Sequence, residues 1–353
     1  MAFLKYNNVK ISGIAAAVPT KVKEVIDQEC FSSKEEAERT IALTHVERSR
    51  IAPEGMCCSD LCYEAADKLV EKLKWDRNEI EAIVYVSISR DYHAPATASL
   101  LQDRLGLTKE CMAFDMPFAC SGFVYGLCTI ASLVETGNIK KALLLVGETT
   151  SRWQCSRDKT LWPLHGDGGT VTALEYDENA ASMYFHLNND GSRGDAIINV
   201  AGGVKHPITT EDLVEVEVEP GIFRNKIQAS MDGMSVFGFA IKEPPQGIVE
   251  MCEKYSLSLD DINYLVLHQA NKYIDDKIGK RLKVPKEKIP FSLQNFGNTS
   301  AASLPMTIVA GIGSKIEQEN ANTIMCGFGS GLSWGCCYVN LDHIVCPELI
   351  EVD

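Results

Sequence analysis

The sequence predicts an α/β protein built from two similar halves, and three observations lead to this prediction. Continuous apolar strands alternate with helical runs of about 10 to 15 residues, a pattern typical of crossover units around buried parallel sheet. The segments 80–133 and 262–312, about 180 residues apart, repeat one order of strand, helix and small-residue stretch. Each half then continues into an apolar strand that ends in glycine, at 142–150 and 322–331.

The elements follow one another in the same way in both halves. In the first, the strand 80–89 (IEAIVYVSIS) precedes a helical run to RLGLTKE and the small-residue stretch 119–133 (ACSGFVYGLCTIASL). In the second, the strand 262–271 (INYLVLHQAN) precedes a run to RLKVPKE and the stretch 298–312 (NTSAASLPMTIVAGI). Any two α/β halves share the order of strand, helix and strand. The RL-x-x-x-KE pattern that both halves contain is a closer similarity than this shared order would give.

The joint between the halves is expected near residues 175 to 200, where the segment 177–195 (DENAASMYFHLNNDGSRGD) is polar and turn-rich. The chain has 353 residues, enough for two domains of roughly 100 to 200 residues each. We therefore predict an N-terminal half of residues 1–175, which carries the nucleophile described below, and a C-terminal half of residues 176–353.

Composition and charge exclude several classes of protein. The 34 Lys and Arg and 48 Asp and Glu residues give a net charge of −14, and 45% of the chain is hydrophobic. An acidic chain repels a phosphate backbone, so nucleic-acid binding is not expected. No apolar run reaches the roughly 18 residues of a membrane span, so no membrane association is expected. The segment where a secretory signal would be apolar is interrupted by the polar residues Lys5, Asn7, Asn8 and Lys10. We therefore expect a cytoplasmic protein.

The 13 cysteines include one cluster that could suggest a metal site. Cys57, Cys58 and Cys62 lie close together, but no C-x-x-C pair repeats and no His pair accompanies them, as a zinc site would require. We interpret these residues as buried thiols, and we expect no metal.

Cys120 is the candidate nucleophile. It lies where the apolar segment 116–119 meets a helical run, so we expect it at the N-terminus of a helix. The helix dipole and unpaired backbone N–H groups at such a position favour a thiolate. The small residues beside Cys120 leave room for a substrate carbonyl.

His268 and Asn298 are its candidate partners in the second half. His268 directly follows the strand YLVL and begins a polar cluster, at the kind of strand end where open α/β sheets place their sites. Asn298 lies in a glycine turn that opens a helix, where a simple N-cap is the alternative interpretation. Because the repeat places this turn opposite that of Cys120, we expect all three residues in one central site.

The glycine-rich turn 327–331 (GFGSG) is not expected to bind phosphate. A phosphate loop must open a helix, whereas the following residues, 332–339, look like another strand. Dinucleotide binding is therefore not expected. The turn would instead supply backbone donors for an oxyanion next to the cysteine.

Five motifs around these residues resemble the β-ketoacyl-[acyl-carrier-protein] synthase III family of thiolase-fold condensing enzymes. They are ACSGFVYGL, HGDGGTVTA, LVLHQANKYI, FGNTSAASLP and GFGSGLSWG, and the match runs nearly end to end. The resemblance implies a thiolase-like fold, with two duplicated βαβαβαββ halves in a five-layered αβαβα body. It also implies a homodimer without metal or redox cofactor.

The resemblance also implies a reaction, with Cys120, His268 and Asn298 as the catalytic set. The cysteine takes an acyl group from a thioester donor. Malonyl-acyl-carrier protein then loses carbon dioxide, and the His and Asn side chains donate hydrogen bonds to its thioester oxygen. The product is a β-ketoacyl thioester of fatty-acid or related biosynthesis. Backbone N–H groups of Cys120 and Ser330 would hold the acyl oxygen, and Phe328 would line the pocket.

Departures from the family concern the acyl donor. Members that use acyl-CoA usually carry a Trp and an Arg-Thr-Gly-Ile stretch, but the segment 35–48 has no tryptophan. Tyr273 replaces a family Arg, and Lys159 lies near another phosphate-contacting Arg position. The donor is therefore expected to be bound either to CoA or to a carrier. Ala94 replaces a large aromatic residue that closes the acyl pocket across the dimer, which predicts a longer or bulkier acyl chain.

A basic patch follows His268 closely and is a candidate docking site for the acidic carrier protein. Its alternative interpretation is a solvated helix face. The residues that we expect to contact the carrier are Lys272, Lys277, Lys280 and Arg281.

Other functions remain open at the level of the sequence. A thiolase-fold enzyme could instead transfer its acyl group to an oxygen or nitrogen acceptor. A Cys-His thioester hydrolase, with Asn298 orienting the imidazole, is a further alternative. A catalytically silent scaffold is disfavoured because all three reactive residues are present.

Overall fold

The computed structural model describes residues 2–319 and 321–353, and its centre consists of two sheets. The first sheet has six strands in the order β17-β2-β8-β7-β5-β6. The strand β5 pairs in parallel with both β6 and β7, and its five residues are all buried and apolar, as expected for a strand covered by helices on both faces. The bounds are β2 (Val9–Pro19), β5 (Ala82–Val86), β6 (Met112–Met116), β7 (Lys141–Glu148), β8 (Gly168–Tyr176) and β17 (Ile350–Val352).

The second sheet has five strands in the order β1-β9-β16-β15-β14. The strands β14 and β15 pair in parallel, and the other three pairs are antiparallel. The strand that the sequence predicts after the glycine turn is present as β16. The bounds are β1 (Ala2–Tyr6), β9 (Met183–Asn189), β14 (Tyr264–Leu267), β15 (Asn322–Gly329) and β16 (Ser333–Asn340).

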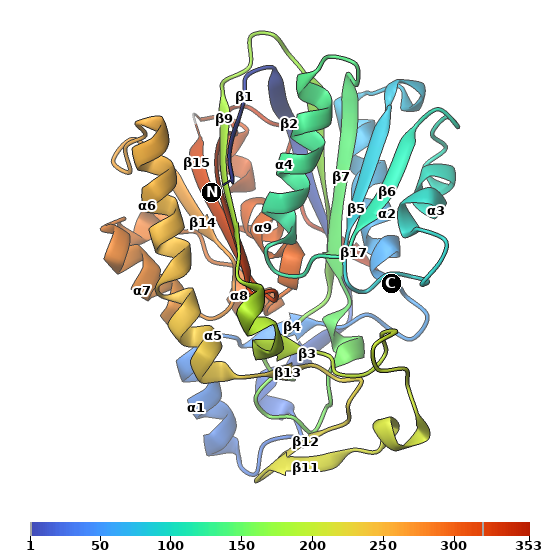
Figure 1. The fold of residues 1–353 in the computed structure, drawn as a ribbon, viewed down its shortest axis with the longest axis vertical. Helices are drawn as coiled ribbons and strands as arrows, with labels where there is room; N and C mark the ends of the chain where they lie inside the picture. The colour runs from blue at the N-terminus through green and yellow to red at the C-terminus, as the bar shows by residue number, and fades with distance from the viewer. Residues whose placement is uncertain (1, 320) are drawn as a thin grey trace.

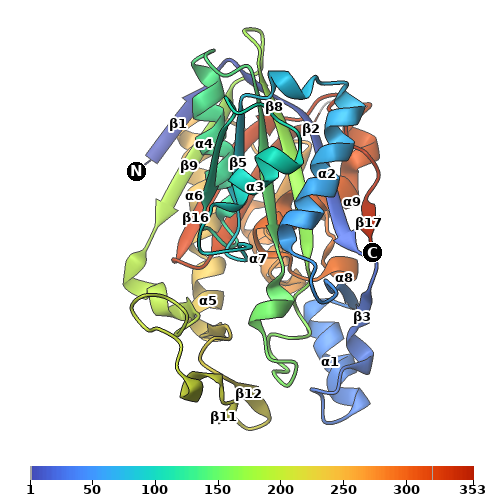
Figure 2. The same ribbon diagram turned by 90° about the vertical axis from the view of Figure 1, so that its right-hand side faces the viewer.

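Helices complete three further layers, which confirms the predicted five-layered αβαβα body. Two helices lie between the sheets and pack on both, and two more cover the outer face of each sheet (Figure 1). Figure 2 shows the outer face of the first sheet with its two helices. The helices between the sheets are α4 (Gly122–Glu135) and α9 (Ser303–Ile316). Those on the first sheet are α2 (Cys58–Leu73) and α3 (Thr97–Arg104), and those on the second sheet are α6 (Glu243–Tyr255) and α7 (Lys272–Leu282).

The duplication that the sequence predicts is visible in the order of strands, with two differences. The sheet neighbours β2-β8-β7-β5 correspond to β9-β16-β15-β14, but residues 289–292, opposite β6, form no strand. Pro290 lies in that segment and has no N–H group to donate to a sheet. In addition, β1 joins the second sheet and β17 joins the first, so each half contributes an edge strand to the other. The division at residue 175 stays a prediction.

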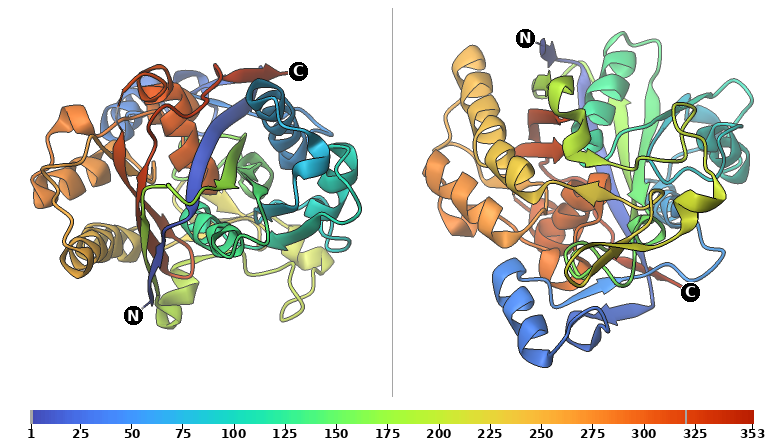
Figure 3. Two further views of the ribbon diagram at one scale, coloured as in Figure 1. Left: turned by 90° about the horizontal axis from the view of Figure 1, so that it is seen from above. Right: turned by 60° about the horizontal axis from the view of Figure 1, so that its bottom comes forward.

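Below the sheets lies a cap that the sequence did not predict. It contains α1, the paired strands β3 and β4, and a hairpin of β11 and β12. Figure 3 shows this end, with α1 in blue and the hairpin in yellow. The bounds are β3 (Val22–Glu24), α1 (Lys34–Thr44), β4 (Arg48–Arg50), β10 (Ile197–Ile198), β11 (Val216–Glu219), β12 (Ile222–Arg224), β13 (Ser230–Met231), α5 (Gly233–Ala240) and α8 (Leu293–Phe296).

Among the described residues, no helix has both the length and the apolar character needed to cross a bilayer. Cys58 and Cys62 are buried on α2, and Cys57 precedes that helix.

Candidate active site

Cys120 lies in the turn between β6 and α4, next to the helix start that the sequence predicts. Helix α4 begins at Gly122, whose missing side chain matters because a Cβ there would lie 2.7 Å from Val86 of β5. Apolar residues at helical spacing bury α4 between the sheets and so fix its N-terminal end. The Cys120 thiol lies 3.6 Å from the hydroxyl of Ser300, which comes from the second half of the chain.

The electrostatics of this thiol differ from the sequence expectation. Burial raises the pKa of Cys120 to about 11, and hydrogen bonds from Ser300 and from the backbone of Cys120 and Ser330 offset that rise only in part. The expectation that the helix terminus favours a thiolate is therefore wrong for the resting enzyme, because desolvation outweighs the donors. The neutral thiol is the resting form at neutral pH.

The glycine turn 327–331 packs directly against the cysteine. A Cβ on Gly329 would lie 2.6 Å from Cβ and 2.9 Å from Sγ of Cys120, so only glycine fits there. This close approach brings the backbone of Ser330 to the thiol. The two backbone groups predicted for the oxyanion site, those of Cys120 and Ser330, thus lie together beside Sγ.

His268 directly follows β14, at the carboxyl end of the strand. Its Nδ1 lies 2.7 Å from the hydroxyl of Ser303, the first residue of α9. The ring of Phe328 meets the imidazole edge-on, with 5.3 Å between centroids. Burial lowers the pKa of His268 to about 3, and a second histidine, His165, adds to this effect. The imidazole is therefore neutral throughout the physiological range of pH.

Asn298 lies in the turn before α9, and its backbone is held by the segment that contains His165. Its N–H donates to the carbonyl of Leu164 (2.8 Å), and its carbonyl accepts from the N–H of Gly166 (3.2 Å). The side-chain Oδ1 accepts a hydrogen bond from the N–H of Ser300 at 2.8 Å. Because Oδ1 is occupied in this way, the amide NH₂ group is left to donate elsewhere.

One cavity collects the three predicted catalytic side chains. Cys120, His268, Asn298 and the pocket residue Phe328 all line a cavity of about 310 Å³. An adjoining cavity of about 460 Å³ also reaches Cys120, and it is lined by Ile88, Trp153, Ile198 and Ser330 among others. The nucleophile therefore lies where two cavities meet.

The remaining predicted residues lie outside these cavities. Ala94 is exposed in the single chain, so its predicted place in a partner's pocket stays a prediction. Lys272, Lys277, Lys280 and Arg281 lie on α7, whose N-terminal residues Asn271 and Ile274 line the smaller cavity. Their role in docking likewise stays a prediction.

Sequence reasoning missed the polar residues that surround the catalytic set. Ser300 and Ser303 contact Cys120 and His268, and Gln154 and His165 line both cavities. His165 is the first residue of the motif HGDGGTVTA, and Ser300 and Ser303 belong to the motif FGNTSAASLP, but no role was predicted for them. Gln154 stands in a stretch with no periodicity, so nothing in the sequence marked it.

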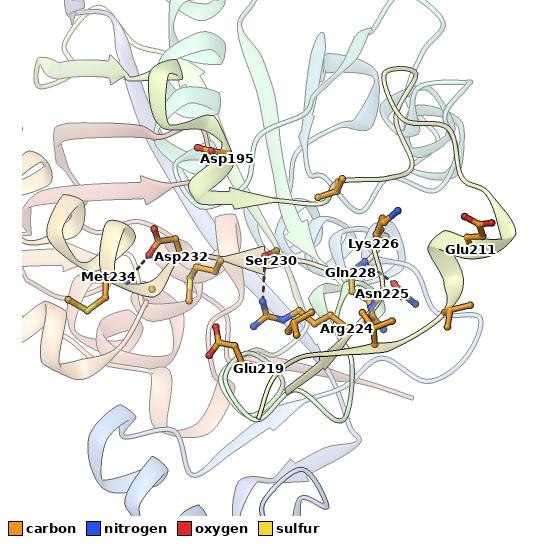
Figure 4. Close-up of a pocket in the computed structure, with 16 residues that line it drawn as sticks. Asp195, Glu211, Glu219, Arg224, Asn225, Lys226, Gln228, Ser230, Asp232 and Met234 are labelled. Atoms are coloured by element: carbon orange, nitrogen blue, oxygen red, sulfur yellow. Dashed lines mark hydrogen bonds between the residues drawn. The ribbon is translucent and has the colours of Figure 1, made fainter. Parts of the chain in front are cut away.

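A larger cavity, of about 820 Å³, adjoins the smaller of these two, because Ser230, Met231 and Gly233 line both. It is formed by residues between 195 and 234, under the hairpin of β11 and β12. Figure 4 shows Arg224 near Ser230 at its centre and Asp232 at the start of α5. Its lining is distinct from the catalytic set, so we place the active site in the two smaller cavities.

The fold and this site together define a thiolase-fold condensing enzyme of the transferase class. A family model, 3-Oxoacyl-[acyl-carrier-protein (ACP)] synthase III, matches residues 114–191, and that for its C terminal matches residues 252–341. The β-ketoacyl-[acyl-carrier-protein] synthase III of Clostridium perfringens is 34% identical over 336 residues, 95% of this chain and 99% of that protein. That of Streptococcus suis is 32% identical over 337 residues, with coverage of 95% and 99%.

A solved structure supports the same assignment. The crystal structure of 3-oxoacyl-(acyl-carrier protein) synthase from Burkholderia xenovorans is similar with a TM-score of 0.93 and 29% identity, covering 99% of each chain. The chain described here belongs to the β-ketoacyl-[acyl-carrier-protein] synthase III family.

Proposed function

We propose that this protein forms a β-ketoacyl thioester by decarboxylative condensation of an acyl group on Cys120 with malonyl-acyl-carrier protein. The observation that carries the proposal is the shared cavity of Cys120, His268 and Asn298. The family assignment supports it, because the relatives named above are β-ketoacyl-[acyl-carrier-protein] synthases III.

The first half-reaction loads the enzyme. Sγ of Cys120 bonds to the acyl carbon of a thioester donor, the carbon–sulfur bond of the donor breaks, and the departing thiol takes the proton of Cys120. The backbone N–H groups of Cys120 and Ser330 lie beside Sγ. They would donate hydrogen bonds to the oxyanion of the tetrahedral intermediate.

The second half-reaction uses His268 and Asn298. The carbon–carbon bond to the malonyl carboxylate breaks, carbon dioxide leaves, and the electron pair passes to an enolate. The proposed reaction requires the tautomer of neutral His268 in which Nδ1 accepts from the Ser303 hydroxyl, so that Nε2 carries the proton and acts as a donor. The amide NH₂ of Asn298 is the second donor to the enolate oxygen, and each such donor is typically worth ~3 kcal/mol.

Carbon–carbon bond formation completes the cycle. The enolate carbon attacks the acyl carbonyl on Cys120, and the sulfur leaves as a thiolate that is then protonated. The acyl oxygen again faces the backbone donors of the glycine turn. A β-ketoacyl thioester on the carrier is the product.

The acyl donor is proposed to be carrier-bound. Lys159, near the family's phosphate-contacting Arg position, forms an ion pair with Glu36 at 2.8 Å. Glu36 lies on α1, and its carboxylate already pairs with the positive charge of Lys159 that a CoA phosphate would need. Faster acylation of Cys120 by an acyl-carrier protein than by the same acyl-CoA would support this choice, and the reverse order would contradict it.

The substitution Asn298→Asp tests the proposed reaction. Aspartate keeps the acceptor for the Ser300 N–H but replaces the amide donor with a negative charge. Release of carbon dioxide from malonyl-acyl-carrier protein should fall by about 100-fold or more, because a donor to the enolate is lost. Loading of Cys120, followed by mass spectrometry of the intact protein, should stay within a few-fold of the parent.

The control is Asn138→Asp, on the exposed surface after α4, which should change neither step. Acyl transfer to an alcohol or amine without release of carbon dioxide would contradict the proposal and favour the O- or N-acyltransferase. Hydrolysis of the acyl enzyme without a β-keto product would favour a thioester hydrolase.

A further inference from the structure

Two polar side chains stand where the two active-site cavities meet. Gln154 and His165 line both cavities, as does Cys120. Most of the wall around them is apolar, with Ile88, Trp153 and Ile197 among the lining residues. The reaction proposed above uses neither side chain.

The hydrogen bonding of His165 fixes what its ring can offer. Nδ1 lies 3.0 Å from the carbonyl of Leu161, and because a carbonyl only accepts, Nδ1 carries the hydrogen. Burial lowers the pKa of His165 to about 4, so the ring is neutral at physiological pH. In this tautomer Nε2 is an acceptor only. Among the described residues, none forms a hydrogen bond with Nε2.

The backbone places this acceptor close to the catalytic set. Residue 165 forms a parallel bridge with Asn298. The charge that His165 would carry if protonated lowers the pKa of His268, so the two imidazoles lie within electrostatic reach. Nε2 is therefore available to a substrate that is bound at Cys120.

Gln154 provides a second, independent observation. Its side-chain Oε1 is buried, and within the described part of the chain it has no hydrogen-bond partner. A buried amide oxygen without a partner destabilises the protein, so such groups usually meet a ligand or water. Here the unpaired oxygen belongs to a side chain of the same cavity wall as His165.

We propose that Gln154 and His165 form a polar subsite that binds a hydrogen-bond donor on the acyl group, so that the enzyme prefers a hydroxylated acyl chain. This inference rests on the proposed function, because it describes the acyl group that Cys120 receives. Each side chain carries an acceptor that has no partner among the described residues, and a hydroxyl group supplies one donor that can pair with either of them. An unsubstituted chain would leave both acceptors desolvated and unpaired.

Two sources of such a donor exist in a thioester substrate. One is a hydroxyl on the acyl chain, and the other is an amide N–H of the thiol arm that delivers it. The larger of the two active-site cavities favours the acyl chain, because His268 and Asn298, which act on the malonyl thioester, line only the smaller one. The experiment separates the two sources.

The test compares acylation of Cys120 by octanoyl thioesters of N-acetylcysteamine, either unsubstituted or with a hydroxyl on carbon 2, 3 or 5. Mass spectrometry of the intact protein reports the rate. At least one hydroxylated chain should react about fivefold faster than octanoyl, which is the fold-change that a hydrogen bond of about 1 kcal/mol gives. Gln154→Leu and His165→Phe should each reduce this preference, the ratio of the hydroxylated to the octanoyl rate, to about twofold or less.

Two further variants sharpen the comparison. His165→Gln keeps an acceptor and should retain part of the preference, which a purely structural role of His165 would not explain. Gln318→Leu makes the same chemical change on the exposed turn after α9 and should retain all of the preference.

The outcomes are distinct. Equal rates for all chains in the parent enzyme, or a preference that survives both Gln154→Leu and His165→Phe, would overturn the inference alone. If the variants slow every chain equally, and this slowing disappears with octanoyl thiophenol ester, the acceptors bind the arm amide and the acyl assignment is wrong. Failure of every thioester to load Cys120 would overturn the proposed function itself.

Discussion

Glu148, at the end of β7, is a fully buried carboxyl group next to the active site. Its oxygens accept hydrogen bonds from the hydroxyls of Ser87 and Ser89 and from the N–H groups of Ile88 and Ser89. Burial raises the pKa of Glu148 to about 7, although these hydrogen bonds oppose the rise. Its negative charge in turn raises the pKa of Cys120. The titration of Glu148 should therefore affect both the stability of the folded protein and the pKa of Cys120.

The raised pKa of Glu148 predicts a pH-dependent stability. Between about pH 4.5 and 7 the folded protein binds more protons here than the unfolded chain, so the free energy of unfolding falls as pH rises. Glu148→Gln does not titrate. The difference in free energy of unfolding between Glu148→Gln and the parent should therefore change by about 2 kcal/mol in favour of the variant from pH 5 to pH 8. This follows from roughly 1.4 kcal/mol per unit of pKa shift.

Urea unfolding at pH 5 and pH 8 measures this difference. The control Glu38→Gln, on the exposed face of α1, should leave the parent's pH dependence unchanged. An identical pH dependence for the parent and Glu148→Gln would show that Glu148 does not carry the effect.

Residues differ in how far the sequence could predict them. Cys120, His268 and Asn298 stand at ends of apolar segments, and the repeat brought these ends together. Gln154 and Glu148 had no comparable signal, because each meets its neighbours only after distant strands pair. The pKa of Cys120 was predicted with the wrong sign, since burial is a property of the whole fold and not of the helix terminus.

At the scale of elements, α7 is the candidate surface for the carrier protein, and its basic residues are not equivalent. Arg281 donates to the carbonyls of Ile241 and Lys242 and so ties α7 to the start of α6. Lys272 forms an ion pair with Asp276. Lys277 and Lys280 are both exposed, and we expect these two to meet an acidic carrier.

Reversal of both charges in Lys277→Glu and Lys280→Glu should raise the apparent KM for malonyl-acyl-carrier protein severalfold at low salt. The reason is loss of electrostatic attraction across the interface, and the effect should shrink as salt increases. The rate with malonyl-N-acetylcysteamine should not change. Lys72→Glu, an exposed site on α2, serves as the control. An unchanged KM for the carrier substrate would remove α7 from the docking surface.

The same scale shows which parts of the fold the sequence could predict. Apolar strands such as β5 and β7 and the long helix α4 were predicted because their burial leaves a periodic pattern. The hairpin of β11 and β12 was not, because both strands are short and β11 has all four residues exposed. Strand exchange by β1 and β17 was also missed, since no local pattern specifies which sheet an edge strand joins.

At the scale of the whole molecule, one sheet edge suggests where a homodimer would form. Strand β6 ends the first sheet and, within the described residues, pairs only with β5, and Met112 on it is exposed. An unpaired edge strand is a ready template for another chain. The predicted homodimer would bury this edge and bring Ala94 of each chain to the partner's acyl pocket. Sedimentation should then give a mass near twice 38.8 kDa.

The dimer makes a prediction about acyl-chain length that the single chain does not. Ala94 should leave space where a larger side chain would close the pocket, so Cys120 of the parent enzyme should accept octanoyl and aryl thioesters at least as well as acetyl. Ala94→Phe fills that space and should lower the octanoyl rate about tenfold or more, because overpacking costs roughly 1–3 kcal/mol. The acetyl rate should stay within about twofold, as a short chain does not reach the pocket wall. Both rates follow from mass spectrometry of the intact protein, and a strong preference of the parent for acetyl would show that another residue closes the pocket.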